Sequence, residues 1–452
     1  MTRFRASLIL LCFDAAATAF VFNAVLVLRN SPAFNQWLVG TLLVPYLACL
    51  VALYLVDGYR LQTDFLGADY LSQHAIALLA ALVATLLLTF VVSPFPTELN
   101  SSRLLIGLSF VALIPVTLSY RRALRLRFLA RRGERTLVFV GDAPSRAAFH
   151  EECVQIGEHQ PVLYAHPTAD AAESDTCLTT IHLETLLTAL EADQRSVDAL
   201  ILHEQSTRLS ETTARRILRL NLRGIPSSTL QHFYEMHWRR IPLSHLSSTW
   251  IFNQGFDIAR EPVTERIKRM SDLFLSGVGL LVATPIVAVA ALAVWLEDRR
   301  SPLFFQTRIG RNGVPFRIMK LRTMQVAQGD LYTAKGDNRI TQVGGFLRKS
   351  RLDEVPQLWN VFKGDMSLIG PRCEWDQLVA RYEKEIPYYH FRHLVKPGIT
   401  GWAQVNYPYG ANLEDTRRKL EYDLYYIRNF SFTLDASIVV KTVHTMLFGK
   451  GT

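Results

Sequence analysis

The chain has 452 residues, 49% of them hydrophobic, and a formal net charge of +9 at neutral pH. This length exceeds what one compact core organises, so we expect two or three domains. The hydrophobic residues are concentrated near the N-terminus and in one later segment, which indicates a membrane protein rather than an ordinary soluble one. The five cysteines lack CxxC spacing and indicate neither a disulfide framework nor a zinc site.

Four apolar segments predict an N-terminal bundle of four transmembrane helices within residues 1–120. Each has roughly 17 to 22 residues, enough to cross about 30 Å of hydrocarbon. The segments are residues 7–28, 38–56, 74–92 and 104–120. Asp14 is the only acidic residue deep inside a span, and we expect it to serve helix packing rather than transport.

A cluster of arginines follows the fourth segment without an acidic residue among them. Its members are Arg121, Arg122, Arg125, Arg127, Arg131 and Arg132. Because positive residues flank the cytoplasmic ends of membrane helices, we expect the N-terminus and everything after residue 120 to be cytoplasmic. Membrane topology therefore accounts for this cluster without a nucleic-acid partner.

Short β-type runs alternate with helical runs between residues 121 and 229, which predicts a central Rossmann-like α/β domain with a parallel sheet. The predicted strands are 136–140, 162–165 and 197–202, and the predicted helices lie near 145–156, 183–192 and 211–221. Gly141-Asp142-Ala143-Pro144 after the first strand lacks the glycines of a dinucleotide site, which favours a scaffold or regulatory domain. Residues 230–264 are rich in aromatics and turns and are predicted to be a linker.

A second apolar segment, residues 273–296, lies in the C-terminal domain predicted for residues 265–452. Thr284-Pro285 falls near its middle, where proline removes a backbone hydrogen bond and bends a helix. Cations stand at both ends of the segment: Arg266, Lys268 and Arg269 before it, Arg299 and Arg300 after it. Since both ends favour the cytoplasm, we predict a re-entrant helix at about residues 272–296. The alternative is a kinked fifth span, which would put the C-terminal domain outside the cell.

Residues 299–351 are strongly basic and should bind an anionic ligand. The cations are Arg299, Arg300, Arg308, Arg311, Arg317, Lys320, Arg322, Lys335, Arg339, Arg348, Lys349 and Arg351, against only Asp330 and Asp337. Glycines among them permit close backbone approach to a ligand. Nucleic acid is the alternative ligand, but no recognition motif is present, and the membrane segments favour a diphosphate near lipid headgroups.

Asp353 and Glu354 form an adjacent acid pair at the end of this basic region. Ser350 or Asp353 could cap a helix, and Pro356 is tolerated only in a first helical turn, so the acids are predicted at a positive helix end. One carboxylate could attack phosphorus while the other holds a divalent cation. A site of oxygen ligands beside a diphosphate suits Mg²⁺.

These motifs resemble the bacterial sugar transferases, also called monotopic phosphoglycosyl transferases, from about Arg266 to the C-terminus. The resemblance rests on Lys268-Arg269-x-x-Asp272, Gln306-x-Arg308-x-Gly310, Lys320-Leu321-Arg322-Thr323-Met324, Asp353-Glu354, Gly370-Pro371-Arg372 and Lys396-Pro397-Gly398-Ile399-Thr400-Gly401-Trp402-Ala403-Gln404-Val405-Asn406. It implies a mainly α catalytic domain that transfers a sugar 1-phosphate from a nucleotide sugar, with UDP expected, to polyprenyl (undecaprenyl) phosphate. The preceding helices and α/β domain are similar to the large form of the family, found in exopolysaccharide and O-antigen assembly.

The resemblance also implies residue roles. Asp353 would be the nucleophile that forms a phosphosugar-enzyme intermediate, and Glu354 would help bind Mg²⁺. The substrate-binding cations would be Lys320, Arg322, Arg339, Arg348, Arg351 and Arg372. Cys373 stands where the family usually has proline, which questions the local turn, and Thr284-Pro285 replaces Ser-Pro, with its hydroxyl expected to reach a freed carbonyl.

Two other functions remain alternatives: a membrane organiser of polysaccharide export without turnover, and a nucleotide-sensing regulator acting through the α/β domain. The expected partners are the nucleotide sugar, polyprenyl phosphate and membrane lipids of a bacterial inner membrane, with no nucleic acid. The sequence leaves the sugar and the oligomeric state open, with a homodimer contact through the α/β domain as one option.

Overall fold

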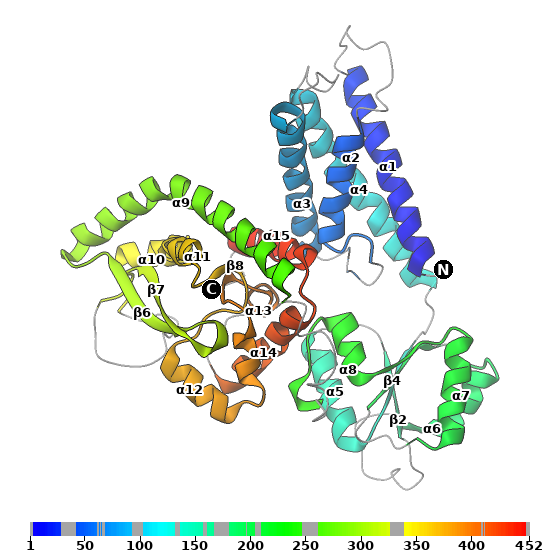
Figure 1. Ribbon diagram of the computed structural model, residues 1–452. Helices are drawn as coiled ribbons and strands as arrows, with labels where there is room; N and C mark the ends of the chain where they lie inside the picture. The colour runs from blue at the N-terminus through cyan, green and yellow to red at the C-terminus, as the bar shows by residue number, and fades with distance from the viewer. Residues whose placement is uncertain are drawn as a thin grey trace. The chain divides into compact units, whose positions relative to one another are not determined.

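A computed structural model describes residues 3–28, 42–60, 63, 65, 68–92, 103–131, 136–156, 161–166, 180–195, 197–203, 209–245, 261–325, 339–407, 410 and 412–448 (Figure 1). The chain divides into two compact units. One is Leu129–Gly255, and the other combines Met1–Phe128 with Phe256–Thr452. Parts of two predictions, residues 38–41 of the second span and 246–260 of the linker, lie outside the described residues, as does Arg132.

The N-terminal helices pack around a common apolar core. They are α1 (Arg3–Leu28), α2 (Leu43–Leu55), α3 (Ala68–Leu87) with its π-helical extension η2 (Leu88–Val92), and α4 (Arg103–Arg131). Phe22 of α1 and Phe110 of α4 meet edge to face in this core, with ring centroids 5.9 Å apart. The outward side chains, such as Phe20 and Val27, are mostly exposed apolar groups, as a lipid-facing surface requires.

By length and composition, four described helices can cross a membrane: Ser7–Leu28, Tyr70–Phe90, Arg103–Arg127 and Pro262–Asp298. The first three correspond to predicted spans, which confirms those apolar segments as long helices. Helix α2 is apolar, but its 13 described residues are shorter than a span.

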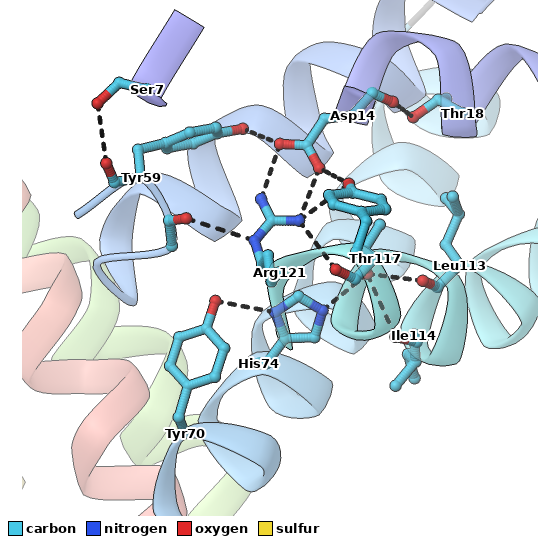
Figure 2. Close-up of polar contacts among 12 residues, drawn as sticks. Ser7, Asp14, Thr18, Tyr59, Tyr70, His74, Leu113, Ile114, Thr117 and Arg121 are labelled. Atoms are coloured by element: carbon cyan, nitrogen blue, oxygen red, sulfur yellow. Dashed lines mark hydrogen bonds and ion pairs between the residues drawn. The ribbon is translucent and has the colours of Figure 1, made fainter. Parts of the chain in front are cut away.

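Asp14 of α1 forms a buried ion pair with Arg121 of α4 (Figure 2). Two guanidinium nitrogens of Arg121 donate to the two carboxylate oxygens of Asp14, each at 2.8 Å. The hydroxyl of Tyr59, in the turn after α2, donates to the same carboxylate at 2.7 Å, and that of Tyr120 also donates to it. Every carboxylate oxygen is therefore hydrogen-bonded, which is the condition under which a buried charge is tolerated.

A second chain of hydrogen bonds connects α3 to α4 beside this pair. Thr117 donates its hydroxyl to the carbonyl of Leu113 at 2.6 Å, so it accepts from Nε2 of His74 at 2.8 Å. Nδ1 of His74 then accepts from the Tyr70 hydroxyl at 3.3 Å (Figure 2). These bonds define one tautomer of the buried histidine.

The ion pair confirms that Asp14 serves helix packing, but it corrects the expectation for Arg121. The side chain of Arg121 is fully buried against Asp14, although the sequence pattern grouped it with the arginines expected at the cytoplasmic end of the fourth span. The sequence pattern misleads here because Arg121 and Asp14 are 107 residues apart, and only packing of α1 on α4 brings them together.

The α/β unit contains one five-stranded parallel sheet in the order β3-β2-β1-β4-β5, which confirms the predicted parallel sheet. Its elements are β1 (Thr136–Val140), α5 (Ala143–Ile156), β2 (Val162–His166), β3 (Thr180–His182), α6 (Leu183–Glu191), β4 (Val197–Leu202), α7 (Glu211–Leu222), β5 (Ser227–Thr229), α8 (Leu230–Phe233), the π-helical turn η5 (Tyr234–Trp238) and the 3₁₀ turn η6 (Leu243–His245).

Alternate residues of β1 point to opposite faces of this sheet and form two separate cores. Val138 and Val140 pack with α6 and α7, whereas Leu137 and Phe139 pack with α5 and α8 (Figure 1). Residues 230–238 contribute to the second core. The packed α/β unit therefore includes the first part of residues 230–264, which were predicted to be a linker. The reason is that the aromatic residues of this stretch pack with α5 on the same face of the sheet.

The C-terminal part contains short strands and many helices. Its elements are α9 (Pro262–Asp298), β6 (Leu303–Ile309), the 3₁₀ turn η9 (Arg311–Gly313), β7 (Pro315–Leu321), α10 (Gln342–Lys349), the 3₁₀ turn η10 (Leu352–Glu354), α11 (Gln357–Lys363), β8 (Ser367–Ile369), α12 (Asp376–Glu385), the 3₁₀ turn η11 (Tyr389–Leu394), β9 (Gly398–Thr400), α13 (Trp402–Asn406), α14 (Leu413–Arg428) and α15 (Phe432–Phe448). Strands β6 and β7 form an antiparallel hairpin, and β8 and β9 form a parallel pair.

Helix α9 is continuous through Pro285 and is bent in its middle part (Figure 1). It begins at Pro262, ten residues before the start expected for the re-entrant helix. The hydroxyl of Thr284 donates to the carbonyl of Leu280 at 2.6 Å. A proline at position 285 frees the carbonyl of Leu281 instead, so the expectation that this hydroxyl serves the freed carbonyl is wrong by one residue.

We expect the Asp14–Arg121 pair to hold the bundle together. Asp14→Ala and Arg121→Ala should each lower the free energy of unfolding by about 3–5 kcal/mol, because each leaves one buried charge without a partner. The double variant Asp14→Leu/Arg121→Met should be more stable than either single variant, since it removes both charges. Thermal unfolding of the purified protein in detergent measures this order, and single variants as stable as the parent would contradict it.

Candidate functional site

The acid pair Asp353 and Glu354 lies in the turn η10, and both residues are buried. Helix α10 ends just before it, and Arg351 takes a left-handed conformation with φ of 59° that reverses the chain into the turn. Neither Ser350 nor Asp353 caps a helix, so that expectation is wrong. The Ser350 hydroxyl donates back to the carbonyl of Phe346 at 2.9 Å, and Pro356 directly precedes α11.

Glu354 receives two cations from distant segments. Nζ of Lys320, near the end of β7, lies 3.1 Å from Oε1 of Glu354, and Nη2 of Arg372 lies 2.6 Å from the same oxygen. Burial raises the pKa of Glu354, but the charges of Arg372 and Lys320 outweigh it and hold the pKa well below its usual range. Glu354 is therefore ionised at any physiological pH.

Asp353 behaves differently from its neighbour. Burial and the negative charge of Glu354 raise the pKa of Asp353, although the positive charges of Lys320, Arg348 and Arg351 oppose the rise. Its Oδ1 atom is buried without a hydrogen-bond partner. The surroundings thus raise the pKa of Asp353 and lower that of Glu354, which is the arrangement expected when two carboxylates have different roles.

Lys320 reaches the acid pair because Asn360 joins β7 to α11. Oδ1 of Asn360 accepts from the amide of Met319 at 3.0 Å, and Nδ2 donates to the carbonyl of Arg317 at 2.8 Å. The Asn360 side chain, which lies in α11 after the acid pair, thus bonds the edge of β7 as a neighbouring strand would. The sequence analysis missed this residue, because a lone asparagine in a short helix has no distinguishing pattern.

Arg372 reaches Glu354 because two backbone segments approach closely. The amide of Gly398 donates to the carbonyl of Pro371 at 2.9 Å, and the amide of Gly370 donates to that of Thr400 at 2.9 Å. A Cβ at Gly398 would lie 2.1 Å from the amide nitrogen of Gly370, so only glycine fits there. Gly370 and Gly398, which come from two different sequence motifs, therefore both allow the close backbone approach that places Arg372.

Arg392, another residue the sequence analysis missed, holds the backbone of Arg372. Its Nη2 donates to the carbonyl of Arg372 at 2.7 Å and lies 3.0 Å from Oδ2 of the buried Asp423. The turn after Arg372 is also held, because Cys373 packs with Ile318 and its carbonyl accepts from Arg308 at 3.3 Å. Cysteine in place of proline is thus accommodated in a fixed turn.

The other cations predicted to bind substrate have different partners, and not all of them face the acid pair. Nε of Arg348 donates to the hydroxyl of Thr323 at 2.9 Å, and its charge acts on Asp353 together with that of Arg351. Arg322 is directed elsewhere, because its guanidinium pairs with Asp298 and its Nε donates to the carbonyl of Ser301 at 2.7 Å. Arg339 has its backbone carbonyl bonded to the amide of Gln325 at 2.8 Å.

The described residues contain no group of three or more His, Cys, Asp or Glu side chains that could hold a metal ion by themselves. A Mg²⁺ ion often takes only one or two carboxylates and completes its shell with water and substrate phosphates. Asp353 and Glu354 meet that smaller requirement. The unpartnered Oδ1 of Asp353 is an available oxygen, whereas Oε1 of Glu354 is already bonded to two cations.

Helix α9 is bonded at both of its ends to the domain that carries these residues. Near its start, Asp272 accepts from the amide of Leu368 at 3.0 Å, and Arg269 donates to the carbonyls of Val361 and Phe362 at 2.6 and 2.7 Å. At its end, Glu297 accepts from the amide of Gln342 at 2.9 Å, in addition to the Asp298–Arg322 pair. Between these ends most large apolar side chains of α9 are exposed.

Comparison with known proteins agrees with the geometry. A family model of bacterial sugar transferases matches residues 263–449. The chain is 39% identical over 257 residues, 56% of its length, to a UDP-N-acetylgalactosamine-undecaprenyl-phosphate N-acetylgalactosaminephosphotransferase of Aeromonas hydrophila. It is 40% identical over 193 residues, 42% of its length, to a UDP-glucose:undecaprenyl-phosphate glucose-1-phosphate transferase of Escherichia coli.

The match covers 60% of the Aeromonas relative's length and 42% of the Escherichia coli relative's length. It covers 98% of a third relative, the exopolysaccharide production protein PSS of Rhizobium leguminosarum, which is 40% identical over 195 residues and matches 41% of this chain. That relative is aligned over nearly its full length, and the family model spans the acid pair with both of its cations. The chain therefore belongs to the bacterial sugar transferase family.

Proposed function

We propose that this protein transfers a sugar 1-phosphate from a UDP sugar to undecaprenyl phosphate, giving a polyprenyl-diphosphate sugar and UMP. The observation that carries the proposal is the buried acid pair, in which Glu354 is bonded to Lys320 and Arg372 while Asp353 keeps an unpartnered oxygen. The functions for which the Aeromonas and Escherichia coli relatives are named, each a transfer from a UDP sugar to undecaprenyl phosphate, support it. The step would begin exopolysaccharide or O-antigen assembly.

In the proposed reaction Asp353 is the nucleophile. One of its oxygens forms a bond to the phosphorus that carries the sugar, and the bond from that phosphorus to the nucleotide breaks, releasing UMP. The lipid phosphate then attacks the same phosphorus and restores the carboxylate. A raised pKa makes Asp353 a stronger nucleophile once it is ionised, and the charges of Lys320, Arg348 and Arg351 favour that ionised form.

The cations stabilise the phosphoryl group in both steps. Lys320 and Arg372 are already ordered by Glu354, so they need no rearrangement when charge develops on the transferred group. Glu354 would help to hold Mg²⁺, which would offset the charge of the diphosphate when bound. Glu354 orients the two cations through Oε1, and its other oxygen would be the one offered to the metal.

We further propose that α9 is re-entrant and that the site faces the cytoplasm. Both ends of α9 are bonded to one domain, through Asp272 near the start and Glu297 near the end. A helix that crossed the bilayer would place its ends on opposite sides, about 30 Å apart. The exposed apolar middle, including Leu281 and Val289, would then lie in one leaflet, and the site would be at the inner surface, where nucleotide sugars occur.

A membrane organiser without turnover would not need this arrangement. Burial of two adjacent carboxylates, one of them with an unpartnered oxygen, costs stability that only a ligand would recover. We therefore favour the enzyme.

Asp353→Asn should lower turnover by at least about 10³-fold, because an amide oxygen cannot form the covalent intermediate. The measurement is UMP release from a panel of UDP sugars, including UDP-glucose and UDP-N-acetylgalactosamine, with undecaprenyl phosphate. Asp376→Asn, a change on α12 outside the acid pair, is the matched control and should remain active. Substantial turnover by Asp353→Asn would exclude its role as nucleophile.

Glu354→Gln should reduce turnover at least about tenfold and raise the Mg²⁺ concentration needed for half-maximal activity, because the amide neither binds the metal well nor neutralises Lys320 and Arg372. A chelator should abolish activity of the parent protein, and added Mg²⁺ should restore it. Glu383→Gln, an exposed change on α12, serves as the control. An unchanged Mg²⁺ titration for Glu354→Gln would contradict its assignment as a ligand.

Cysteines introduced at the two exposed ends of α9, Val263→Cys and Arg300→Cys, should both react with a membrane-impermeant maleimide from the cytoplasmic side. Leu281→Cys in the exposed apolar middle should stay unlabelled in intact membranes and react in detergent. The parent chain gives the background from its own cysteines. Labelling of the two ends from opposite sides would show that α9 crosses the bilayer.

A further inference from the structure

The backbone of Arg372 is fixed by a side chain as well as by a neighbouring strand segment. Arg372 forms an isolated strand bridge to Gly398, whose amide donates to the carbonyl of Pro371 at 2.9 Å. The carbonyl of Arg372 itself accepts from Nη2 of Arg392 at 2.7 Å. A buried guanidinium thus holds the carbonyl of the residue that pairs with Glu354.

The guanidinium of Arg392 is in turn held by groups from three segments. Its Nη2 lies 3.0 Å from Oδ2 of Asp423 on α14, and its Nη1 donates to the hydroxyl of Tyr389 at 2.6 Å. Nη1 also lies 4.0 Å from Oε1 of Glu374. The side chains of Arg392 and Asp423 are only 6% and 2% exposed. Packing therefore confines the guanidinium that binds the carbonyl of Arg372.

Stability of the domain does not by itself explain a buried Arg392–Asp423 pair. Both charges lose their hydration, and an apolar pair of similar volume often leaves a protein equally stable or more stable. An apolar pair cannot, however, donate a hydrogen bond to the carbonyl of Arg372. The buried pair therefore points to a requirement of Arg372 rather than to a requirement of the core.

The side chain of Arg372 depends on where its backbone lies. Its Nη2 donates to Oε1 of Glu354 at 2.6 Å, while the side chain as a whole is 36% exposed. Its other N–H groups can therefore reach a substrate phosphate. Because a misplacement of about 1 Å in a binding group can lower a rate by about 10²-fold, a fixed backbone at this position matters for the reaction.

We propose that Arg392 and Asp423 are positioning residues that hold Arg372 where it binds the transferred phosphoryl group. Arg392 acts through the carbonyl of Arg372, does not contact the substrate and transfers no proton. The inference rests on the proposed function, because it assigns what this pair does for phosphoryl transfer. Lys320, the other cation bonded to Glu354, is placed separately, through Asn360 and β7.

The test removes the pair from the full-length protein without leaving a buried charge. Arg392→Met/Asp423→Leu replaces both charges by apolar side chains, so its thermal midpoint of unfolding should stay near that of the parent. The first-turnover rate of UMP release from a UDP sugar, without lipid acceptor, should fall by about 10- to 100-fold because Arg372 loses its fixed position. Arg381→Met, a change of an exposed arginine on α12, is the matched control and should release UMP at the parental rate.

A double-mutant cycle with Arg372→Ala separates positioning from a general structural role. Once Arg372 is alanine, removal of the Arg392–Asp423 pair should lower the rate by less than about twofold, because the pair has no other route to the reaction. A structural role would instead multiply the two losses. A parental rate in Arg392→Met/Asp423→Leu, or multiplied losses in the combined variant, would overturn the inference.

Arg392→Lys decides the question if the apolar variant does not fold, since it keeps a positive charge beside Asp423. One ammonium group replaces the two nitrogens that bind Tyr389 and the carbonyl of Arg372, so the rate should fall at least about threefold. A parental rate in this variant would refute the positioning role.

The proposed function is checked separately from this inference. A parent protein that releases no UMP, or an Asp353→Asn variant that turns over, would refute the proposed function and its nucleophile. Failure of the positioning role is seen only against an active parent, as unchanged rates in the Arg392 variants.

Discussion

The C-terminal domain is organised around one buried carboxylate, that of Glu354. A carboxylate removed from water must be paired, and here its two partners come from β7 and from the segment after β8. These segments approach because Asn360 binds the edge of β7 and because Gly398 admits the backbone of Gly370. Much of the surrounding structure can thus be understood as the support that one charged contact requires.

Asp14 and Asp353, two of the buried acidic residues in the described part of the chain, differ in how fully their oxygens are hydrogen-bonded. Asp14 is bonded at both oxygens by Arg121 and by two tyrosine hydroxyls, so it has no capacity left for a ligand. Asp353 retains a buried oxygen without a hydrogen-bond partner. Full satisfaction is typical of a group that stabilises a fold, and incomplete satisfaction is typical of a group that awaits a substrate.

Polar side chains near both ends of the long apolar helix α9 bond it to the region around the acid pair. Arg269 and Asp272 bind the backbone around α11 and β8, and Asp298 pairs with Arg322 just after β7. Arg322 therefore connects the end of the membrane helix to the strand that presents Lys320. Arg322, predicted as a substrate-binding cation, is bonded to the end of α9 and to the carbonyl of Ser301.

The sequence by itself determined the features that depend on local pattern: the long apolar helices, the parallel sheet, and an acid pair beside a helix start among many cations. Hydrophobic periodicity and motif spacing are properties of short stretches, so they can be read along the chain. Only the tertiary structure decided which cation meets which acid. Arg121, counted among the arginines after the fourth span, is buried on Asp14, and Arg372 pairs with Glu354 while Arg322 pairs with Asp298. The physical reason is that charge pairing acts through space between residues far apart in sequence, which no local pattern records.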